Sequence, residues 1–454
     1  MRYHVRSEEE AKRLAPQVGD YVRLWNIEFR WTELHQNPSQ LASMRHSVDQ
    51  LADAAFRELA LVPKQAAYEA LEAAIDSKDV ARYPNCHKLW HQVHTVPEWV
   101  DFEQIRRGQD VFFRYAGAAF TGLLNDSLLG GFGARRISEV LVRTGSFGVE
   151  SARRRLLQTT QWILDVMDNP DAVRVGAKGW KNTISVCEEK PDFYDIEENG
   201  LPINDLHSLV TLTSFSSTLI DHTFPAMYVY LTKRQRDDYI ALWRWLAYLI
   251  GTDDKYFVDA DMARACLESI TLAELWPDQD EESHTRTLLH NSISAIANQP
   301  PSRMSYDYIC AQVRWLHGDE YSDALGIPQV TYYARFITAA KVSFFLVMSG
   351  LGYIVPGLDK RRIERIRPIL YNMVVTSKEV GLGNPVGFEM EWAPTVESLV
   401  RRAAPLTREQ EKSVSLGMEK HYFTALFFVL SGVVGTSYVG VLGLQTIYRH
   451  LALQ

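Results

Sequence analysis

The chain has 454 residues, of which 46% are hydrophobic and 23% charged, and its formal net charge is −8. This composition supports a sizeable packed core and argues against extended disorder. A negative chain without a long basic block also argues against a nucleic-acid partner, which needs a concentrated positive surface. The four cysteines (Cys86, Cys187, Cys266 and Cys310) lie far apart and form no CxxC pair. They are typical of reduced thiols in a reducing compartment, not of a disulfide framework or a zinc site.

Hydrophobic residues recur with the period of an α-helix along most of the chain, and strand-like alternation is scarce. Residues 41–61 place Leu41, Met44 and Val48 on one face, as an amphipathic helix does. Pro63 opens a second helical stretch that runs to about Ser77. Further helices are predicted at 101–119, 135–143, 151–167, 206–220, 235–250, 261–274, 285–297 and 330–349. The sequence therefore predicts an all-α fold, with one large helical domain and a C-terminal helical tail.

Changes in composition divide the chain into three parts. We expect an N-terminal helical region at 1–80, a main domain at 81–380, and a linker with apolar C-terminal helices at 381–454. The linker is indicated by the closely spaced glycines and prolines of residues 381–406, which are typical of an irregular connection.

The two ends of the chain bear on where the protein acts. The first residues are charged and lack an apolar h-region, so we predict that the protein is not secreted. Residues 422–448 contain no charged side chain and are long enough for a membrane span of roughly 20 residues. Length alone does not separate membrane contact from a buried core helix, and both alternatives stay open.

Two polar clusters have the residue types of binding sites. His87, His91 and His94 have the spacing of one helical face, where three imidazoles could converge on a metal ion. The alternative is a partly exposed histidine-rich turn. Arginines gather around residues 135–155, and closely set guanidinium groups favour anions such as carboxylates or porphyrin propionates. The alternative is a solvated helix face, which the sequence favours for Arg153–Arg155. The aromatic residues Tyr239, Trp243, Trp245 and Tyr248 are instead expected in the core.

Four separated stretches, in order over residues 96–251, resemble one known family. They are Val-Pro-Glu-Trp-Val-Asp at 96–101 with Arg-Gly-Gln-Asp-Val-Phe at 107–112; Ser-Leu-Leu-Gly-Gly at 127–131 with the run from Arg136 to Arg143-Thr144-Gly145; Gly179-Trp180, Gly-Leu-Pro-Ile-Asn at 200–204 and Thr-Ser-Phe-Ser at 213–216; and Tyr-Ile-Ala-Leu-Trp-Arg at 239–244 with Leu-Ile-Gly at 249–251. In order and spacing they resemble the catalytic domain of latex-clearing rubber oxygenases and of MpaB-type oxygenases of secondary metabolism.

The resemblance implies a mainly helical fold with a globin-like core and haem b. It also implies oxygen-dependent attack on an alkene of a hydrophobic small molecule, prenylated or polyketide-derived, with O2 as the second substrate. Arg143 and Thr144 would lie on the distal side of the haem and polarise bound oxygen, and Arg136 would contribute to cofactor binding. The MpaB-type branch implies the endoplasmic reticulum membrane, and the alternative location is the cytoplasm.

One element of the family pattern is absent. In the family, the Gly-Trp element leads into Val-Arg-x-x-His, whose histidine ligates the iron; here no histidine lies between Trp180 and Asn204. Haem iron needs an axial donor. Three explanations compete: haem has been lost, another residue ligates, or the sequence lacks an exon. The replacement ligands would be His207, the first choice for the metal, or His222 or Cys187.

Three functions follow as hypotheses. The first is a haem-dependent oxygenase. The second is a non-catalytic relative that has kept the scaffold and binds a hydrophobic ligand or a partner. The third is a non-haem metal enzyme that uses His87, His91 and His94.

Overall fold

The structure is a computed structural model of the chain. It describes residues 1–59, 67–143, 147–148, 151–184, 201, 203–278, 280, 283–300, 302–354 and 357–386, together with Glu419, Tyr422 and Thr424.

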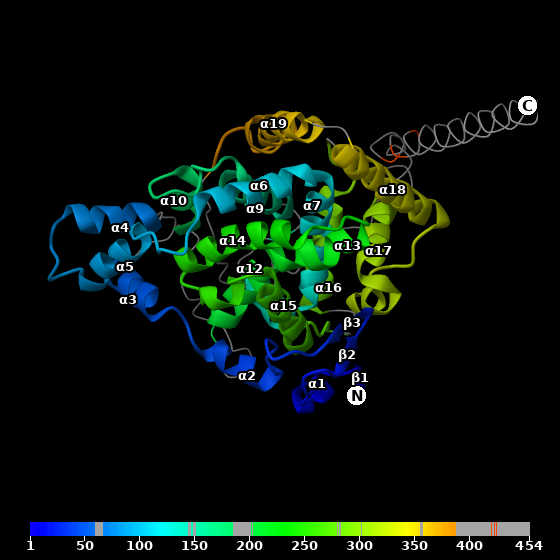
Figure 1. Cartoon of the computed structure of the whole chain (residues 1–454), viewed down its shortest axis with the longest axis horizontal. Helices are drawn as coiled ribbons and strands as arrows, with labels where there is room; N and C mark the ends of the chain where they lie inside the picture. The colour runs from blue at the N-terminus through cyan, green and yellow to red at the C-terminus, as the bar shows by residue number, and fades with distance from the viewer. Residues whose placement is uncertain are drawn as a thin grey trace, which may run out of the picture.

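Helices make up most of the described chain, which confirms the predicted helical class (Figure 1). The α-helices are α1 (Glu8–Arg13), α2 (Pro38–Ala42), α3 (Gln50–Leu59), α4 (Ala67–Asp76), α5 (Pro84–His94), α6 (Phe102–Arg114), α7 (Ala116–Gly122), α8 (Arg135–Arg143), α9 (Ala152–Met167), α10 (Lys178–Ile184), α12 (Asp205–Phe215), α13 (Phe224–Ala226), α14 (Lys233–Ile250), α15 (Ala260–Glu274), α16 (His284–Ile296), α17 (Tyr306–Leu325), α18 (Tyr332–Ile354) and α19 (Leu358–Tyr371). Shorter 3-10 segments are η1 (Ser43–His46), η3 (Gly131–Gly133) and η5 (Asp254–Phe257), and π-helical segments are η2 (Leu123–Gly130), η4 (Thr218–Thr223) and η6 (Asn372–Thr376).

The N-terminal region is not wholly helical, contrary to the prediction for 1–80. It contains a three-stranded sheet in which β1 (Arg2–Val5) pairs parallel to β2 (Tyr21–Leu24), and β2 pairs antiparallel to β3 (Ile27–Arg30). The prediction missed it because each strand has only four residues. Their inward side chains are nevertheless apolar: Val22, Leu24 and Phe29 pack in one cluster with Leu272 of α15. The sheet thus closes one end of the helical body.

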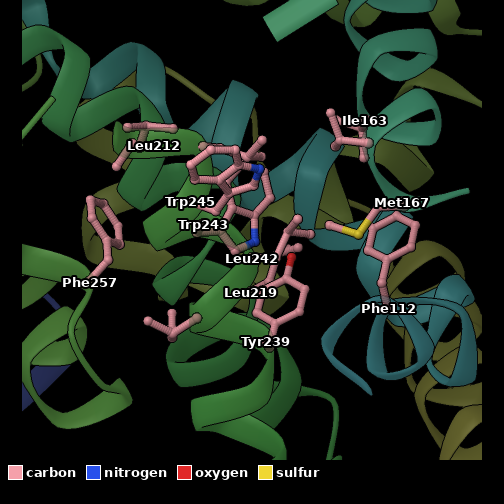
Figure 2. Packing of buried hydrophobic residues seen from close by; sticks show 14 of the residues in the cluster. Phe112, Ile163, Met167, Leu212, Leu219, Tyr239, Leu242, Trp243, Trp245 and Phe257 are labelled. Carbon is pink, nitrogen blue, oxygen red and sulfur yellow. The ribbon is translucent and has the colours of Figure 1, made fainter. Parts of the chain in front are cut away.

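Helix α14 is the central element of the core (Figure 1). Its N-cap is Thr232, which forms a capping box with Gln235, and it ends at Gly251, whose φ of 81° suits glycine best. The predicted core residues Tyr239, Trp243 and Trp245 are fully buried, which confirms their packing role. Figure 2 shows them between Leu212 of α12 and Ile163 and Met167 of α9.

Close helix packing around α14 depends on small residues and aromatic contacts. Helix α6 crosses α14 at Gly108, where any side chain would overlap the Asp238 backbone carbonyl. On the other side, the rings of Phe215 and Trp243 stack at 5.9 Å between centroids, and Trp162 meets Trp243 nearly edge-on at 6.1 Å. Such aromatic pairs contribute about 0.5–1.5 kcal/mol beyond their buried area.

Most predicted helices lie close to their observed bounds, but those predicted at 101–119 and 206–220 are interrupted at Tyr115 and Ser216, and the one predicted at 41–61 is interrupted as well. The last breaks between η1 and α3, where Asp49 accepts hydrogen bonds from the backbone of Leu51 and Ala52. Short polar side chains of this kind compete with helical hydrogen bonds and favour a new helix start. Helix α17 was not among the predicted helices. The predicted 330–349 helix is α18.

No helix among the described residues is both long and apolar enough to cross a membrane. The apolar stretch 422–448 lies outside the described residues except for Tyr422 and Thr424. Tyr422 contacts α18, with its ring 6.0 Å from that of Phe344 and 6.3 Å from that of Phe345. Membrane contact through this stretch stays a prediction, as do the boundaries at 80 and 380.

Candidate functional site

A large cavity with a mostly apolar surface, partly open to solvent, lies among the helices. Its volume is about 1170 Å³, slightly more than the roughly 300–1,000 Å³ typical of small-molecule sites. Helices α7, α8, α9, α12, α18 and α19 contribute to its wall together with η2, and the apolar lining includes Phe120, Val140, Leu156, Phe215, Phe345 and Leu370. A cavity of this size and polarity suits a large hydrophobic ligand.

The surface of the cavity wall is mostly apolar, and His207 is one of the polar residues that line it. It is the third residue of α12. The side chain of the N-cap residue Asn204 accepts a hydrogen bond of 2.8 Å from the His207 backbone N–H, which fixes this first turn. His207 is only 6% exposed, so its side chain lies in the interior and does not face solvent. The structure therefore places the first-choice ligand at the cavity.

Lys341 and Gln312 form a hydrogen-bonded pair of polar side chains in the same wall. The Lys341 ammonium group, on α18, donates a hydrogen bond to the side-chain oxygen of Gln312 on α17, and Lys341 is buried. Burial lowers the pKa of Lys341 to about 7, because removing the charge from water is costly. The pair thus places a buried amine and an amide at the cavity wall.

Arg136 lies away from the cavity lining. Its guanidinium group is buried and pairs with Glu8 at 2.9 Å and with Glu274 at 3.4 Å. Burial alone would lower the pKa of Arg136, but the two carboxylates raise it above its ordinary value. A buried cation needs such partners. The geometry thus gives Arg136 a structural ion-pair role and does not bring it to a cofactor in this cavity.

The other face of α8 does line the cavity, through Ile137, Val140 and Leu141. Arg143 is the last residue of α8, and its side chain lies outside the described residues, as does Thr144. Cys187 is likewise outside them. The proposed distal role of Arg143 and Thr144 therefore stays a prediction.

The three histidines of α5 do not form a metal-binding group. His91 is exposed, whereas the His94 Nδ1 atom lies 2.8 Å from the Trp90 carbonyl oxygen and its ring packs on Trp90 at 3.9 Å. Their spacing does give one face, but positions i and i+7 are separated by about 10 Å along a helix. Three imidazoles spread over that length do not meet at one ion.

A different group does meet the geometry of a metal site: Asp126 of η2, His222 of η4 and His317 of α17. The three candidate ligand atoms lie within 4.8 Å of one another. His222 Nδ1 is 2.8 Å from Asp126 Oδ2, and His317 Nε2 is 3.3 Å from Asp126 Oδ1. His222 was considered as a haem ligand, but the structure pairs it with Asp126, and it does not line the cavity.

The three side chains of this Asp–His–His cluster shift one another's pKa values. Burial would raise the pKa of the Asp126 carboxyl, but the adjacent His222 and His317 hold that pKa below its ordinary value. For His222, the effect of the Asp126 carboxylate exceeds that of burial and raises the pKa. Burial lowers the pKa of His317 to about 4, so its imidazole is neutral near pH 7. A neutral imidazole is the form that ligates metals.

Sequence reasoning missed Asp126 and His317 because no local spacing connects them. Asp126 is 96 positions from its partner His222. One signal was available: in the Leu-Leu-Gly-Gly stretch, Gly130 faces the His317 ring, and a methyl group there would overlap that ring. A glycine at such a position indicates a close approach of another element, but it does not say which one.

Comparison with known proteins gives the family. A family model described as "ER-bound oxygenase mpaB/B'/Rubber oxygenase, catalytic domain" matches residues 106–344, which is more than half of the chain. No curated protein matches. Among solved structures, the chain is similar to a structure of latex clearing protein LCP in the closed state, with 15% identity, a TM-score of 0.44, and coverage of 73% of this chain and 94% of that one.

The matched segment runs from α6 to α18 and thus contains the cavity residue His207, the Lys341–Gln312 pair and the Asp–His–His cluster. Membership of an oxygenase family supports an oxidoreductase. The chain belongs to the family of MpaB-type and rubber oxygenases, and residues 106–344 carry its catalytic domain.

Proposed function

We propose that the protein is a haem-dependent oxygenase that oxidises or cleaves an alkene bond of a hydrophobic, prenylated or polyketide-derived molecule. The family supports the oxygenase chemistry. The observation that carries the finer proposal is the cavity of about 1170 Å³, whose lining is mostly apolar and includes a buried histidine. Secondary metabolism is the setting that this substrate class favours.

The residues around the cavity fit a haem group. His207 offers an imidazole, the commonest kind of axial donor, and α12 holds its backbone in place through the Asn204 cap. Arg153 and Arg155 also line the cavity and are suited to anionic propionates. Of the three explanations for the missing family histidine, we therefore propose replacement of the ligand by His207.

Bound haem would supply the activation of O2. The chain's own residues would then bind and orient the substrate. Side chains such as Phe120, Leu156 and Phe345 would bury its hydrocarbon part and exclude water. The Lys341–Gln312 pair would hold its polar end, because it offers buried hydrogen-bonding groups at the cavity wall. Arg143 and Thr144 keep the predicted role of polarising oxygen.

Reconstitution with haemin tests this proposal. The purified full-length chain should develop a Soret band at one equivalent of haemin, and His207→Ala should reduce that band at least tenfold at the same haemin concentration. The matched control is His91→Ala, which alters an exposed side chain and should give the same Soret band as the unmodified chain. A wild-type chain without a Soret band would refute haem dependence. A full band in His207→Ala would refute the assignment of the ligand.

Activity tests the substrate class separately. The haem-loaded protein should consume O2 when given a short oligoisoprenoid and should not do so with a saturated hydrocarbon of equal length. Equal rates, or no consumption with either, would contradict alkene oxidation.

The place of action is a further part of the proposal. A hydrophobic substrate and the family's ER-bound members favour the endoplasmic reticulum membrane over the cytoplasm. Cell fractionation of the full chain should find it in the microsomal pellet, and deletion of 415–454 should release it. Recovery of the intact chain in the supernatant would favour the cytoplasm.

A further inference from the structure

The Asp–His–His cluster is built on irregular helix geometry at all three positions. Asp126 lies in the π-helical segment η2 and His222 in the π-helical segment η4. His317 directly precedes Gly318, whose φ of 74° interrupts α17. π-Helical turns are rare and are frequently found at functional sites. Two π-helical segments and one helix kink that converge on one cluster indicate that the backbone is shaped to bring these side chains together.

The distances between the side chains suit a metal ion. With metal–ligand bonds of about 2.1 Å, neighbouring ligand atoms are about 3.0 Å apart in octahedral geometry and about 3.4 Å apart in tetrahedral geometry. The observed separations are 2.8 Å between His222 Nδ1 and Asp126 Oδ2 and 3.3 Å between His317 Nε2 and the other carboxylate oxygen, Oδ1. One candidate ligand atom from each of the three groups lies within 4.8 Å of the other two. Small adjustments would therefore place one ion between the three groups.

The His317 ring supplies a second, independent observation. Its Nε2 atom is buried and makes no hydrogen bond, although Asp126 lies nearby. A buried polar atom without a partner is costly, by about 1–3 kcal/mol. Opposite this atom stands Gly130, where even a methyl group would overlap the ring. The nitrogen is thus aimed at the carboxylate within a space that is kept clear of side chains.

The carboxylate is also held in a fixed orientation. Thr223 donates a hydrogen bond of 2.5 Å from its hydroxyl to Asp126 Oδ2. Outer hydrogen bonds of this kind are typical of carboxylates that ligate metals, since they orient the ligand before the ion arrives. Asp126 itself is 3% exposed at its side chain, so the site lies in the interior.

We propose that Asp126, His222 and His317 bind one divalent transition-metal ion. Two imidazoles and one carboxylate form the donor set of non-haem iron(II) sites, which leave further positions open for water or small ligands. We therefore expect iron(II) as the natural ion and cobalt(II) as a spectroscopic substitute. This site is separate from the haem proposed at His207 and goes beyond that function.

The metal site lies directly behind the wall of the cavity. Asn125 and Ser127, the neighbours of Asp126 in η2, both line the cavity, whereas Asp126 does not. A change of ligation at Asp126 would therefore act on the cavity through the same π-helical segment. The alternative is a cluster that is held by hydrogen bonds alone and binds no ion. The test must distinguish this alternative from a metal-binding cluster.

Metal titration of the haem-free full-length chain tests the proposal. After chelator treatment and dialysis, cobalt(II) should bind with one equivalent per chain and give visible absorption bands. His317→Gln should weaken binding at least tenfold, while the exposed His91→Ala should leave it unchanged. Far-UV circular dichroism and the midpoint of urea unfolding would show that His317→Gln is folded.

A second pair of variants keeps the test decisive if His317→Gln fails to fold. Gly130→Ala intrudes on the His317 ring, whereas Gly131→Ala meets nothing within 4 Å. We expect weakened cobalt binding only in Gly130→Ala. Binding below one-tenth of an equivalent in the unmodified chain, or equal affinity in the unmodified chain, His317→Gln and Gly130→Ala, would overturn the proposal. The haemin-dependent Soret band of His317→Gln should stay intact, because His317 does not line the cavity, so failure here and failure of haem binding are distinguishable.

Discussion

Two groups of histidines in this protein differ in how closeness in the sequence relates to closeness in space. His87, His91 and His94 share one short helix and attract attention in the sequence, but in the structure they spread along α5 without converging. His222 and His317 come from distant elements and meet at the buried carboxylate of Asp126. The difference shows that helical spacing places side chains on one face, whereas a binding site requires that several elements point inward to the same place.

The largest effect is expected from removing the carboxylate. Asp126→Ala leaves His222 and Thr223 without their shared acceptor in the interior. Loss of one partner from a buried charged cluster costs about 3–5 kcal/mol. Urea unfolding of the metal-free protein should show this loss in the free energy of unfolding. A loss below about 1 kcal/mol would mean that the cluster is energetically unimportant.

A smaller effect is expected from crowding the cluster. Gly130→Ala should destabilise the protein by about 1–3 kcal/mol, because an added methyl group in a packed interior forces side chains or backbone to move. The neighbouring Gly131→Ala should change the free energy of unfolding by less than about 0.5 kcal/mol, since no atom lies within 4 Å of the added carbon. Equal effects of the two variants would show that the close approach to His317 does not matter.

In the cavity wall, the buried Lys341 should make the free energy of unfolding depend on pH. The pKa of Lys341 is lowered to about 7 in the folded protein, below the ordinary value near 10.4. Between pH 7 and 10 the unfolded state therefore binds the additional proton, and the free energy of unfolding should rise with pH. This contribution is at most about 1.4 kcal/mol per pH unit.

Lys341→Met should remove this slope, because no group then takes up a proton on unfolding at that position. Unfolding experiments at several pH values between 7 and 10 would compare the variant with the unmodified chain. Identical slopes would show that the ammonium group reaches water or a counter-charge in solution.

The smallest effect is expected in α5. His91→Ala alters an exposed side chain whose Nδ1 lies 3.5 Å from the Thr95 hydroxyl, at the outer limit of a hydrogen bond. We expect a change within about 0.5 kcal/mol and unchanged cobalt binding. A large loss of cobalt binding in His91→Ala would indicate that His87, His91 and His94 form the metal site.

Much of the fold was predictable because it follows from local patterns. The helical period predicted α8, α9, α14 and α16 close to their observed bounds, and the aromatic run of α14 was correctly expected in the core. The sheet at residues 2–30 was missed because four-residue strands give too short an alternation. The break before α3 depends on Asp49, whose capping role competes with a continuous helix.

The site was predictable only in part. His207 could be chosen because it is a histidine near the stretch that resembles the family, and it does line the cavity. Arg136 could not be placed from the sequence, since its partners Glu8 and Glu274 lie 128 and 138 positions away. Lys341 carried no local signal either, because its importance comes from burial beside Gln312 of a different helix.

Chemical rescue of a missing side chain would show directly whether His207 holds haem in the cavity. His207→Gly should lose the Soret band in the presence of haemin, and free imidazole should restore it by occupying the vacated position. A full Soret band in His207→Gly without imidazole, unaltered when imidazole is added, would contradict haem ligation by His207.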